Sequence, residues 1–450
     1  MKINHNISAQ LANVNLKKID TRLSASLQRL SSGYKINKAA DDSAGMAISN
    51  KMRTQIKALD RAGRNALDGD SIIQTAEGAM TEIENMLQRI RELGVQSAND
   101  TLALEDRQAI QKEVDDLLDE IDRISRATEF NGKGLLDGSS SRTTMTNSLA
   151  IRSISASMDV PLGEYTITVE DIAMPAKNSL SYDIPSVVSI NGYTIEIGPD
   201  ESVQSVNKRL IEICDSMGID AEASGTSLEL TTRAKGSAQQ IAVRSAGEEE
   251  VDFGDPGIDA VINLGDEFAP EDSFSYSASG ALITIVGSGG FEMQIDTSNA
   301  EGGEEGIVRV EDAGYMVLQI GANEHQTLEM DIYELTCQSL SLRDIDGVNQ
   351  INACTQAGAT HMISKIDEAI SKVSEARSTL GAFQNRLDST RASLDISVEN
   401  LTDSMSRIMD TDMASEMTEY TQRSVLSQAA SSMLAQANNR PQEIMALMQS

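Results

Sequence analysis

Residues 366–408, which read IDEAISKVSEARSTLGAFQNRLDSTRASLDISVENLTDSMSRI, determine the fold class of this 450-residue chain. A hydrophobic side chain recurs every seventh residue through the stretch, and Phe383, Val398 and Met405 follow members of this series by three or four residues. Such a sustained heptad pattern predicts a long helix that packs along one seam against a partner helix. The predicted seam consists of Ile366, Val373, Leu380, Leu387, Leu394, Leu401 and Ile408.

The N-terminal third carries further helical patterns. Hydrophobic residues step by three or four positions through residues 83–93 and again through 110–124, which predicts amphipathic helices. A first helix is expected to run to Leu30 and to end near Gly33, because glycine commonly terminates a helix. Asp42 offers an N-cap side chain for the helix that follows. Both ends of the chain are therefore expected to be helical.

The middle of the chain differs from both ends, since six of the seven prolines fall between residues 161 and 270. Proline inside a helix costs about 3 kcal/mol, so this region is not expected to continue the helical arms. Alternating hydrophobic and polar residues predict strands there, with one short helix around 203–213. The candidate strands are 164–169, 193–197, 227–231, 281–286 and 291–295. The predicted fold class is mainly α, with long coiled-coil arms from both termini and an α+β or β insert between them.

The charge of the chain excludes several kinds of partner. There are 37 basic and 69 acidic residues, which gives a net charge of −32. Such a chain would repel a nucleic-acid backbone and anionic membrane surfaces. No stretch approaches 18 apolar residues, and the N-terminus lacks the apolar core of a signal peptide. We therefore expect no nucleic-acid binding, no membrane insertion and no cleaved secretion signal.

Side chains suited to catalysis or metal binding are few and scattered. The histidines show no H-E-x-x-H spacing, and the cysteines form no C-x-x-C pair. These residues are His5, His325, His361, Cys214, Cys337 and Cys354. We expect the cysteines to be buried as small apolar groups, and we expect no catalytic residue, no metal site and no cofactor.

Several motifs in both arms resemble those of bacterial flagellins. The N-terminal arm contains LSSGYKIN at 30–37, AADDSAGMAI at 39–48, LQRIRELGVQSAN at 87–99 and FNG at 130–132. The C-terminal arm contains LQIGAN at 318–323, LGAFQNRL at 380–387 and MLAQAN at 433–438. The resemblance covers roughly 1–140 and 315–450, with both arms in the family's order.

The resemblance implies a hairpin topology in which both termini return to one end and pair as an inner coiled coil. Residues 1–42 and 410–450 would form this inner domain, and residues 43–160 and 311–409 a helical core domain with a β-hairpin. Residues 161–310 would be a variable insert that projects outward. The implied protein is a non-enzymatic subunit that self-assembles into the flagellar filament outside the cell, after export by the flagellar type III route.

The resemblance also implies a surface that serves both subunit assembly and recognition by host Toll-like receptor 5. Arg89, Leu93 and Gln96 are spaced by four and three residues, so they are expected to share one helical face. Gly94 stands where many relatives have alanine, which weakens this helix by up to about 1 kcal/mol. The implied contact residues are Gln88, Arg89, Arg91, Glu92, Leu93, Gln96 and Glu113.

The C-terminal segment 410–450 resembles the part of flagellins that the flagellar secretion chaperone holds before export. Its apolar face is expected to include Met413, Met417, Val425, Leu426, Met433, Leu434, Ile444 and Leu447. The other implied partners are further copies of the chain, which form a helical homopolymer, and the hook-associated junction and cap proteins.

Three other functions remain possible from the residues alone. A hook–filament junction protein shares the terminal helices but not the pattern at 87–99 and 433–438. A flagellin with a zinc peptidase in its insert would need a metal motif that this sequence lacks. A cytosolic coiled-coil scaffold would not account for the paired motifs at the two ends.

Overall fold

The computed structural model describes residues 6–148, 151–157, 160–245, 251–268, 274–288, 290–311, 313–344 and 347–449, without the side chains of 266 and 441–449. These residues form two compact units. The terminal unit comprises the chain up to Ala66, Gln319–Gln326, and the chain from Ser389 onward. The central unit comprises Leu67–Leu318 and Thr327–Asp388.

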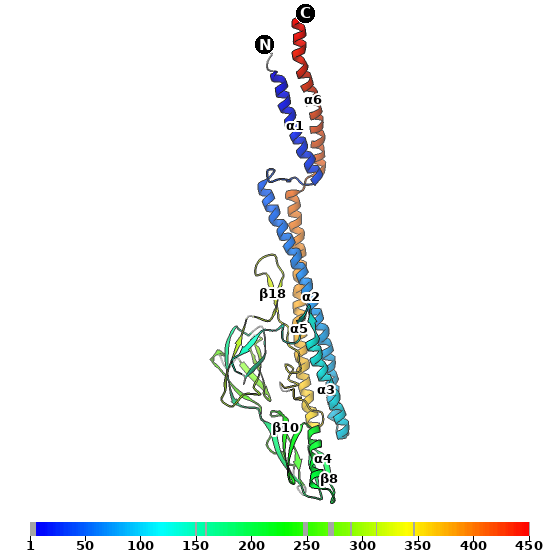
Figure 1. Ribbon diagram of the computed structural model, residues 1–450, viewed down its shortest axis with the longest axis vertical. Helices are drawn as coiled ribbons and strands as arrows, with labels where there is room; N and C mark the ends of the chain where they lie inside the picture. The colour runs from blue at the N-terminus through cyan, green and yellow to red at the C-terminus, as the bar shows by residue number, and fades with distance from the viewer. Residues whose placement is uncertain are drawn as a thin grey trace. The chain divides into compact units, whose positions relative to one another are not determined.

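Six α-helices lie in the described part of the chain, and several of them are labelled in Figure 1. The prediction of a mainly α chain with helical arms and a β-rich insert is confirmed. The helices are α1 (Ile7–Ser32), α2 (Ser43–Ser97), α3 (Leu104–Ala127), α4 (Val203–Ser216), α5 (Gln356–Met409) and α6 (Met413–Gln449).

The predicted helix ends occur where the capping residues stand. α1 ends at Ser32, and Gly33 adopts the left-handed conformation (φ 76°) while its N–H donates to the carbonyl of Arg29. α2 starts after Asp42, whose Oδ1 accepts a hydrogen bond of 3.0 Å from the N–H of Gly45. Asn131 and Gly132, both with positive φ, form the tight turn between β1 (Glu129–Phe130) and β2 (Lys133–Gly134), as hairpin turns of this kind require.

In the terminal unit, α1 and α6 lie side by side and run antiparallel, so that α1 begins and α6 ends at the same end of the pair (Figure 1). At the other end the N–H of Thr411 donates to the carbonyl of Gly33, and the N–H of Lys35 donates to that of Met409. A small core around Leu59 and Leu394 joins α2 to α5 within this unit. The sequence pattern alone could not show this pairing of the two termini.

The central unit contains the rest of α2 and α5, the whole of α3, and the strands. Its helices carry fully buried hydrophobic side chains, such as Ile83 on α2, Leu118 on α3 and Val373 on α5. Apart from the hairpins at 129–134 and 316–330, the strands form two modules. The first has the sheets β12-β5-β16-β3 and β13-β14-β15-β4, and the second has the sheets β6-β10-β9 and β11-β7-β8 with α4.

The first module encloses one core in which the rings of Tyr165, Phe268, Phe274 and Phe291 lie with centroids 4.9–5.9 Å apart. Its strands are β3 (Thr144–Thr146), β4 (Arg152–Ala156), β5 (Gly163–Asp171), β12 (Val261–Leu264), β13 (Phe274–Ser279), β14 (Leu282–Gly287), β15 (Glu292–Asp296) and β16 (Glu305–Val310), with the short helix η1 (Asp266–Phe268). β3 and β4 precede residue 161 but pair with β16 and β15. The β-rich part therefore starts earlier than the predicted insert, because strands this short leave little alternation to detect.

The second module is nested inside the first. The chain leaves β5 and re-enters β12, two strands that pair directly, and every strand of the second module lies between them in sequence. Val206 and Leu210 of α4 pack on its sheets, as the predicted short helix requires. The strands are β6 (Pro175–Ser181), β7 (Ser186–Ile190), β8 (Tyr193–Ile197), β9 (Ile219–Ser224), β10 (Ser227–Lys235) and β11 (Val243–Arg244); β17 (Met316–Gln319) and β18 (Thr327–Met330) form a separate hairpin.

Candidate assembly and receptor surfaces

The predicted seam residues of α5 are buried to different degrees along the helix. Ile366, Val373, Leu380 and Leu387 are buried in the central unit. Leu394 is buried in the terminal unit, whereas Leu401 and Ile408 are half-buried there. Leu387 meets α2 at Gly69, where a Cβ atom would lie 3.2 Å from its Cδ1 atom. The seam residues thus provide the α5 side of a helix–helix contact, most completely in the central unit.

The α1–α6 pair has polar groups in its interior. Only Ser26 on α1 and Glu416 on α6 are buried among the described side chains of the two helices. Asn6 donates a hydrogen bond of 2.9 Å to the carbonyl of Ala437, and Ser427 donates one of 2.8 Å to Asp20. These bonds help to align the two helices in an antiparallel register, beside half-buried hydrophobic side chains such as Leu23 and Leu434.

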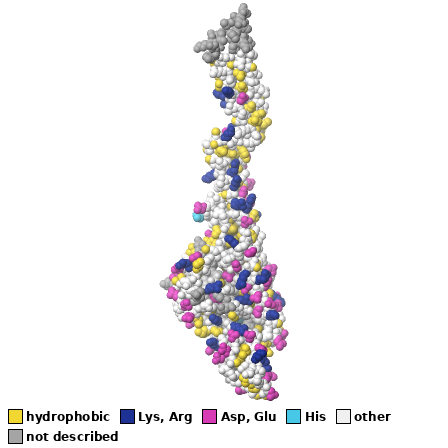
Figure 2. All heavy atoms as spheres, in the orientation of Figure 1, with side chains coloured by type: hydrophobic (Ala, Val, Ile, Leu, Met, Phe, Trp, Pro, Cys, Tyr) yellow, Lys and Arg dark blue, Asp and Glu magenta, His cyan; other side chains and the backbone are white. Residues whose placement is uncertain are grey.

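Large hydrophobic side chains of the same pair face outward. Leu11 is 62% exposed and Met433 is 66% exposed, and Figure 2 shows hydrophobic side chains at the surface along this part of the chain. The other exposed members are Ile7, Val14, Leu27, Met413, Met417, Val425 and Leu426, and Leu434 is half-buried. Ile444 and Leu447 belong to α6, but their side chains lie outside the described residues.

These side chains of α6 do not lie on a single face, contrary to the expectation from sequence. A helix turns about 100° per residue, so Met413 and Met433 point in directions about 200° apart. Since the hydrophobic residues surround the helix, no single neighbour can cover them all. The arrangement suits a helix that is contacted from several sides.

The predicted receptor surface lies on α2 and α3 in the central unit. Arg89 donates hydrogen bonds of 3.0 and 2.8 Å to Oε1 of Glu113 on α3, and one of 3.2 Å to Glu92 on α2. These bonds, the one to Glu113 first, raise the pKa of Arg89. Gln88 and Gln96 are exposed on the same helix. Five of the seven predicted residues therefore form one exposed polar surface that joins the two helices.

Leu93 does not belong to this surface, because it is only 2% exposed. Its neighbour Gly94 is also buried, and a Cβ atom there would lie 2.8 Å from Cε of Met362 and 3.1 Å from Cγ1 of Ile363 on α5. Gly94 therefore faces α5, and Leu93 is covered within the central unit. Spacing alone placed Leu93 beside Arg89 but could not show which side of the helix was covered.

Arg91 lies on the side of α2 that faces α5, where its Nε atom donates a hydrogen bond of 2.6 Å to Asp367. Sequence reasoning missed this partner, and it also missed the bonds of Arg377 on α5 to Glu84 on α2. The paired residues are 276 and 293 positions apart. No local sequence signal links residues at that separation.

Within the described residues, no group of three or more His, Cys, Asp and Glu side chains could hold a metal ion, and no helix is long and apolar enough to cross a membrane. His5 lies outside the described residues. The three cysteines are buried free thiols, as expected. Burial raises the pKa of Cys214 to about 12 and that of Cys354 to about 11, so both thiols are protonated at neutral pH.

Comparison with known proteins places both arms in one family. Residues 3–141 match the bacterial flagellin N-terminal helical region, and residues 363–448 match the bacterial flagellin C-terminal helical region. The chain is 36% identical to a flagellin of Clostridium tyrobutyricum, over 98% of this chain and 100% of that protein. It is 33% identical to flagellin B of Vibrio anguillarum, over 100% of this chain and 99% of that protein.

Solved structures are matched less closely. A flagellar hook associated protein-3 from Legionella pneumophila has a TM-score of 0.32 and 15% identity, over 80% of this chain and 98% of that chain. That likeness supports no further argument, and the assignment depends on the sequence matches at full length. The chain belongs to the bacterial flagellin family and is a structural subunit of the flagellar filament.

Proposed function

We propose that copies of this chain polymerise into the filament through the hydrophobic side chains that the α1–α6 pair leaves exposed. The observation that carries the proposal is the exposure of large hydrophobic side chains on both helices, such as Leu11 at 62% and Met433 at 66%. Exposed hydrophobic side chains in such density mark an interaction surface. Their distribution around α6 fits a helical homopolymer, in which each subunit meets several neighbours.

The energy available from this surface is large enough to drive assembly. Burying one exposed valine, leucine or methionine side chain contributes about 1.5–3 kcal/mol, and several such residues lie on each copy. In this proposal residues 1–42 and 410–450 form the inner coiled coil, 43–160 and 311–409 the helical core, and 161–310 the outer insert. The filament end would meet hook-associated junction and cap proteins.

Seeded polymerisation tests the proposal. The purified chain, mixed with filament fragments, should form long tubes of constant diameter in electron micrographs, and a truncation lacking residues 410–450 should form none. Met433→Asp should raise the subunit concentration needed for growth at least about tenfold, because an aspartate resists burial. Val187→Asp is the matched control, since Val187 is 51% exposed on the second module. Short oligomers from the intact chain would contradict the proposal and favour a junction protein.

We also propose that the exposed residues of 410–450 bind the flagellar secretion chaperone before export through the type III route. Met413, Met417 and Val425 are exposed in the single chain and available to such a partner. Binding of the purified chaperone should weaken with Met417→Asp and remain unchanged with Val187→Asp. Equal binding of both variants would show that the chaperone holds another segment.

A second proposed function is recognition by Toll-like receptor 5 through Arg89, Glu113 and the exposed glutamines beside them. Supporting this, the guanidinium of Arg89 is held in place by Glu113 while half of its side-chain surface remains exposed. A fixed arginine loses little conformational freedom when it binds. Leu93 is not part of this proposal because it is buried.

A receptor reporter cell line measures this function on monomeric protein. Arg89→Ala should raise the concentration for half-maximal response at least about tenfold, as for an interface hot spot. Arg309→Ala is the control, because Arg309 makes a comparable exposed pair with Glu164 in the first module. A response that is equal for the two variants would exclude Arg89 as a receptor contact while leaving the assembly proposal intact.

A further inference from the structure

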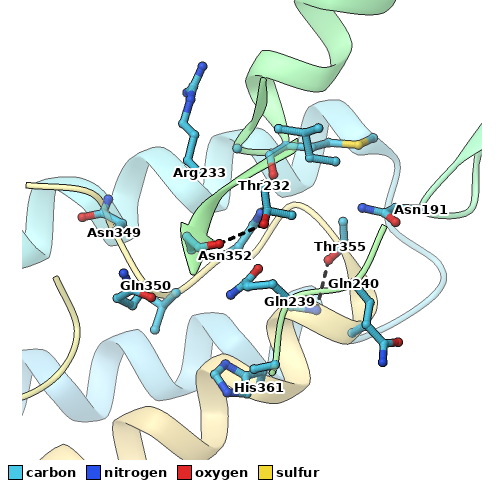
Figure 3. Close-up of a pocket in the computed structure, with 18 of the residues that line it drawn as sticks. Asn191, Thr232, Arg233, Gln239, Gln240, Asn349, Gln350, Asn352, Thr355 and His361 are labelled. Atoms are coloured by element: carbon cyan, nitrogen blue, oxygen red, sulfur yellow. Dashed lines mark hydrogen bonds between the residues drawn. The ribbon is translucent and has the colours of Figure 1, made fainter. Parts of the chain in front are cut away.

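A cavity of about 600 Å³ opens in the central unit, where the second module meets the helices. Its lining comes from α3, from loops of the second module, from the irregular segment 347–355 and from the start of α5. Figure 3 shows Gln239, Gln350 and His361 around one space, with Asn352 and Thr355 also at its wall. The volume lies within the range of about 300–1,000 Å³ that small-molecule sites occupy.

Hydrogen bonds between polar residues fix the position of the cavity wall. Gln111 on α3 accepts a hydrogen bond of 2.6 Å from the N–H of Ala353 and donates one of 2.8 Å to Asp115. Asn352 donates one of 2.6 Å to the carbonyl of Met217 in the second module. Three separate segments of the chain are thus tied together at the cavity, so its walls are pre-formed rather than assembled by a ligand.

Other amides at the cavity remain free to bind a ligand. The side chains of Gln239, Gln240, Gln350 and Gln356 make no hydrogen bond among the described residues, although all four line the cavity and the first and third are half-buried. An amide side chain offers both donors and an acceptor. This combination matches hydroxyl groups, which also donate and accept.

The charged groups of the lining all have polar partners. Arg233 forms ion pairs with both Asp215 and Asp220, and it points away from the cavity in Figure 3. The carboxylate of Asp115 accepts hydrogen bonds from Gln111 and Asn349. Burial, followed by the charge of Lys365, lowers the pKa of His361, so its ring is neutral at physiological pH. Two aspartates share the one charge of Arg233, so the charge left over at the lining is negative and disfavours an anionic ligand.

The lining of the cavity also contains one phenyl ring. Phe253 lines the cavity and is 55% exposed, which is uncommon in a chain with only six phenylalanines, three of them in the core of the first module. An exposed ring in the same cavity as free amides can pack against the C–H face of a sugar ring while the amides bind its hydroxyls. A wholly apolar ligand would leave the amides unpaired and is disfavoured for that reason.

We propose that this cavity is a binding site for a neutral saccharide of one or two rings, with Gln239 and Gln350 bonding its hydroxyls and Phe253 packing on one face. The inference is independent of polymerisation, because none of these residues lies on α1 or α6. Each subunit would then present a saccharide-binding site at the second module.

The test is calorimetric titration of the full-length monomeric chain with glucose, galactose, N-acetylglucosamine and lactose, with glucuronic acid as the anionic comparison. At least one neutral sugar should bind with a millimolar or lower dissociation constant and more tightly than glucuronic acid. Gln350→Ala should weaken its binding about fivefold, the worth of one neutral hydrogen bond. Ala238→Trp, at the cavity wall, should abolish binding while the circular dichroism spectrum stays unchanged.

Gln204→Ala is the matched control, because Gln204 is an exposed glutamine of α4 that does not line the cavity. Three outcomes would overturn the proposal. These are no binding by any of the neutral sugars, binding that survives both Gln350→Ala and Ala238→Trp, and tighter binding of glucuronic acid that Arg233→Ala removes. The last result would identify an anion site at the ion pairs of Arg233 instead.

Discussion

The hydroxyl of Ser26 donates a hydrogen bond to Oε1 of Glu416, a residue 390 positions away, and these two are the buried residues among the described side chains of α1 and α6. The guanidinium of Arg29 lies 3.6 Å from the other carboxylate oxygen. A buried carboxylate that keeps its charge needs such partners, because desolvation would otherwise favour separation of the helices. This contact therefore joins the two ends of the chain in a defined register.

Ser26→Val should destabilise the α1–α6 pair by about 1–3 kcal/mol, because it leaves the buried Glu416 oxygen without its hydroxyl donor. The urea concentration that dissolves assembled filaments should fall accordingly. Ser432→Ala is the control, since the Ser432 hydroxyl bonds only to Gln428 of its own helix and is exposed. Equal urea resistance of the two variants would show that Ser26 does not support the pair.

Side chains added at two glycines of α2 should change the free energy of unfolding in opposite directions. A Cβ atom added at Gly78 would have no other atom within 4 Å, so Gly78→Ala should raise the free energy of unfolding by about 0.5–1 kcal/mol through helix propensity. Gly94→Val should lower it by about 1–3 kcal/mol, because the branched side chain meets Met362 and Ile363. Chemical denaturation of the monomer measures both changes, and a stabilised Gly94→Val would contradict the close packing of α2 on α5.

The second module should be removable without loss of the first. Met174 and Ile258, at its entrance and exit, exchange two backbone hydrogen bonds of 2.9 and 3.0 Å. Replacing residues 175–257 by Asn-Gly would close a two-residue hairpin turn between them. The shortened chain should keep a cooperative unfolding transition for the first module, monitored by the near-ultraviolet signal of its Tyr–Phe cluster. It should also lose saccharide binding, since most of the cavity wall would be gone.

Stability should depend on pH through Asp331. Burial raises the pKa of this carboxyl to about 6. The backbone N–H groups of Arg142 and Ile332, together with the charge of Arg142, act in the opposite direction and favour the ionised form. The folded state then binds a proton that the unfolded state releases at lower pH, so this residue's contribution to stability falls as the pH rises from about 4 to about 6. Asp331→Asn should therefore stabilise the chain by about 1–3 kcal/mol more at pH 7 than at pH 4. An effect of equal size at both pH values would contradict the shifted pKa.

Local sequence determined the helices, their ends and the five strands β5, β8, β10, β14 and β15, because these depend on residues close together in the chain. The heptad series in α5 predicted a helix of the observed kind, Gly33 predicted the end of α1, and Asn131-Gly132 predicted a tight turn. The five-part division of the filament subunit, the receptor residues and the chaperone segment stay predictions. They concern contacts with other molecules, which a single chain does not contain.

Only the tertiary structure decided which faces are covered. It buried Leu93 and left Arg89 exposed, it nested the second module between β5 and β12, and it brought Arg91 to Asp367. The physical reason is that a helical or β pattern sets the spacing of side chains along one element but not the identity of the element that packs on it. That partner comes from residues far away in the chain, whose position depends on the free energy of packing the whole fold.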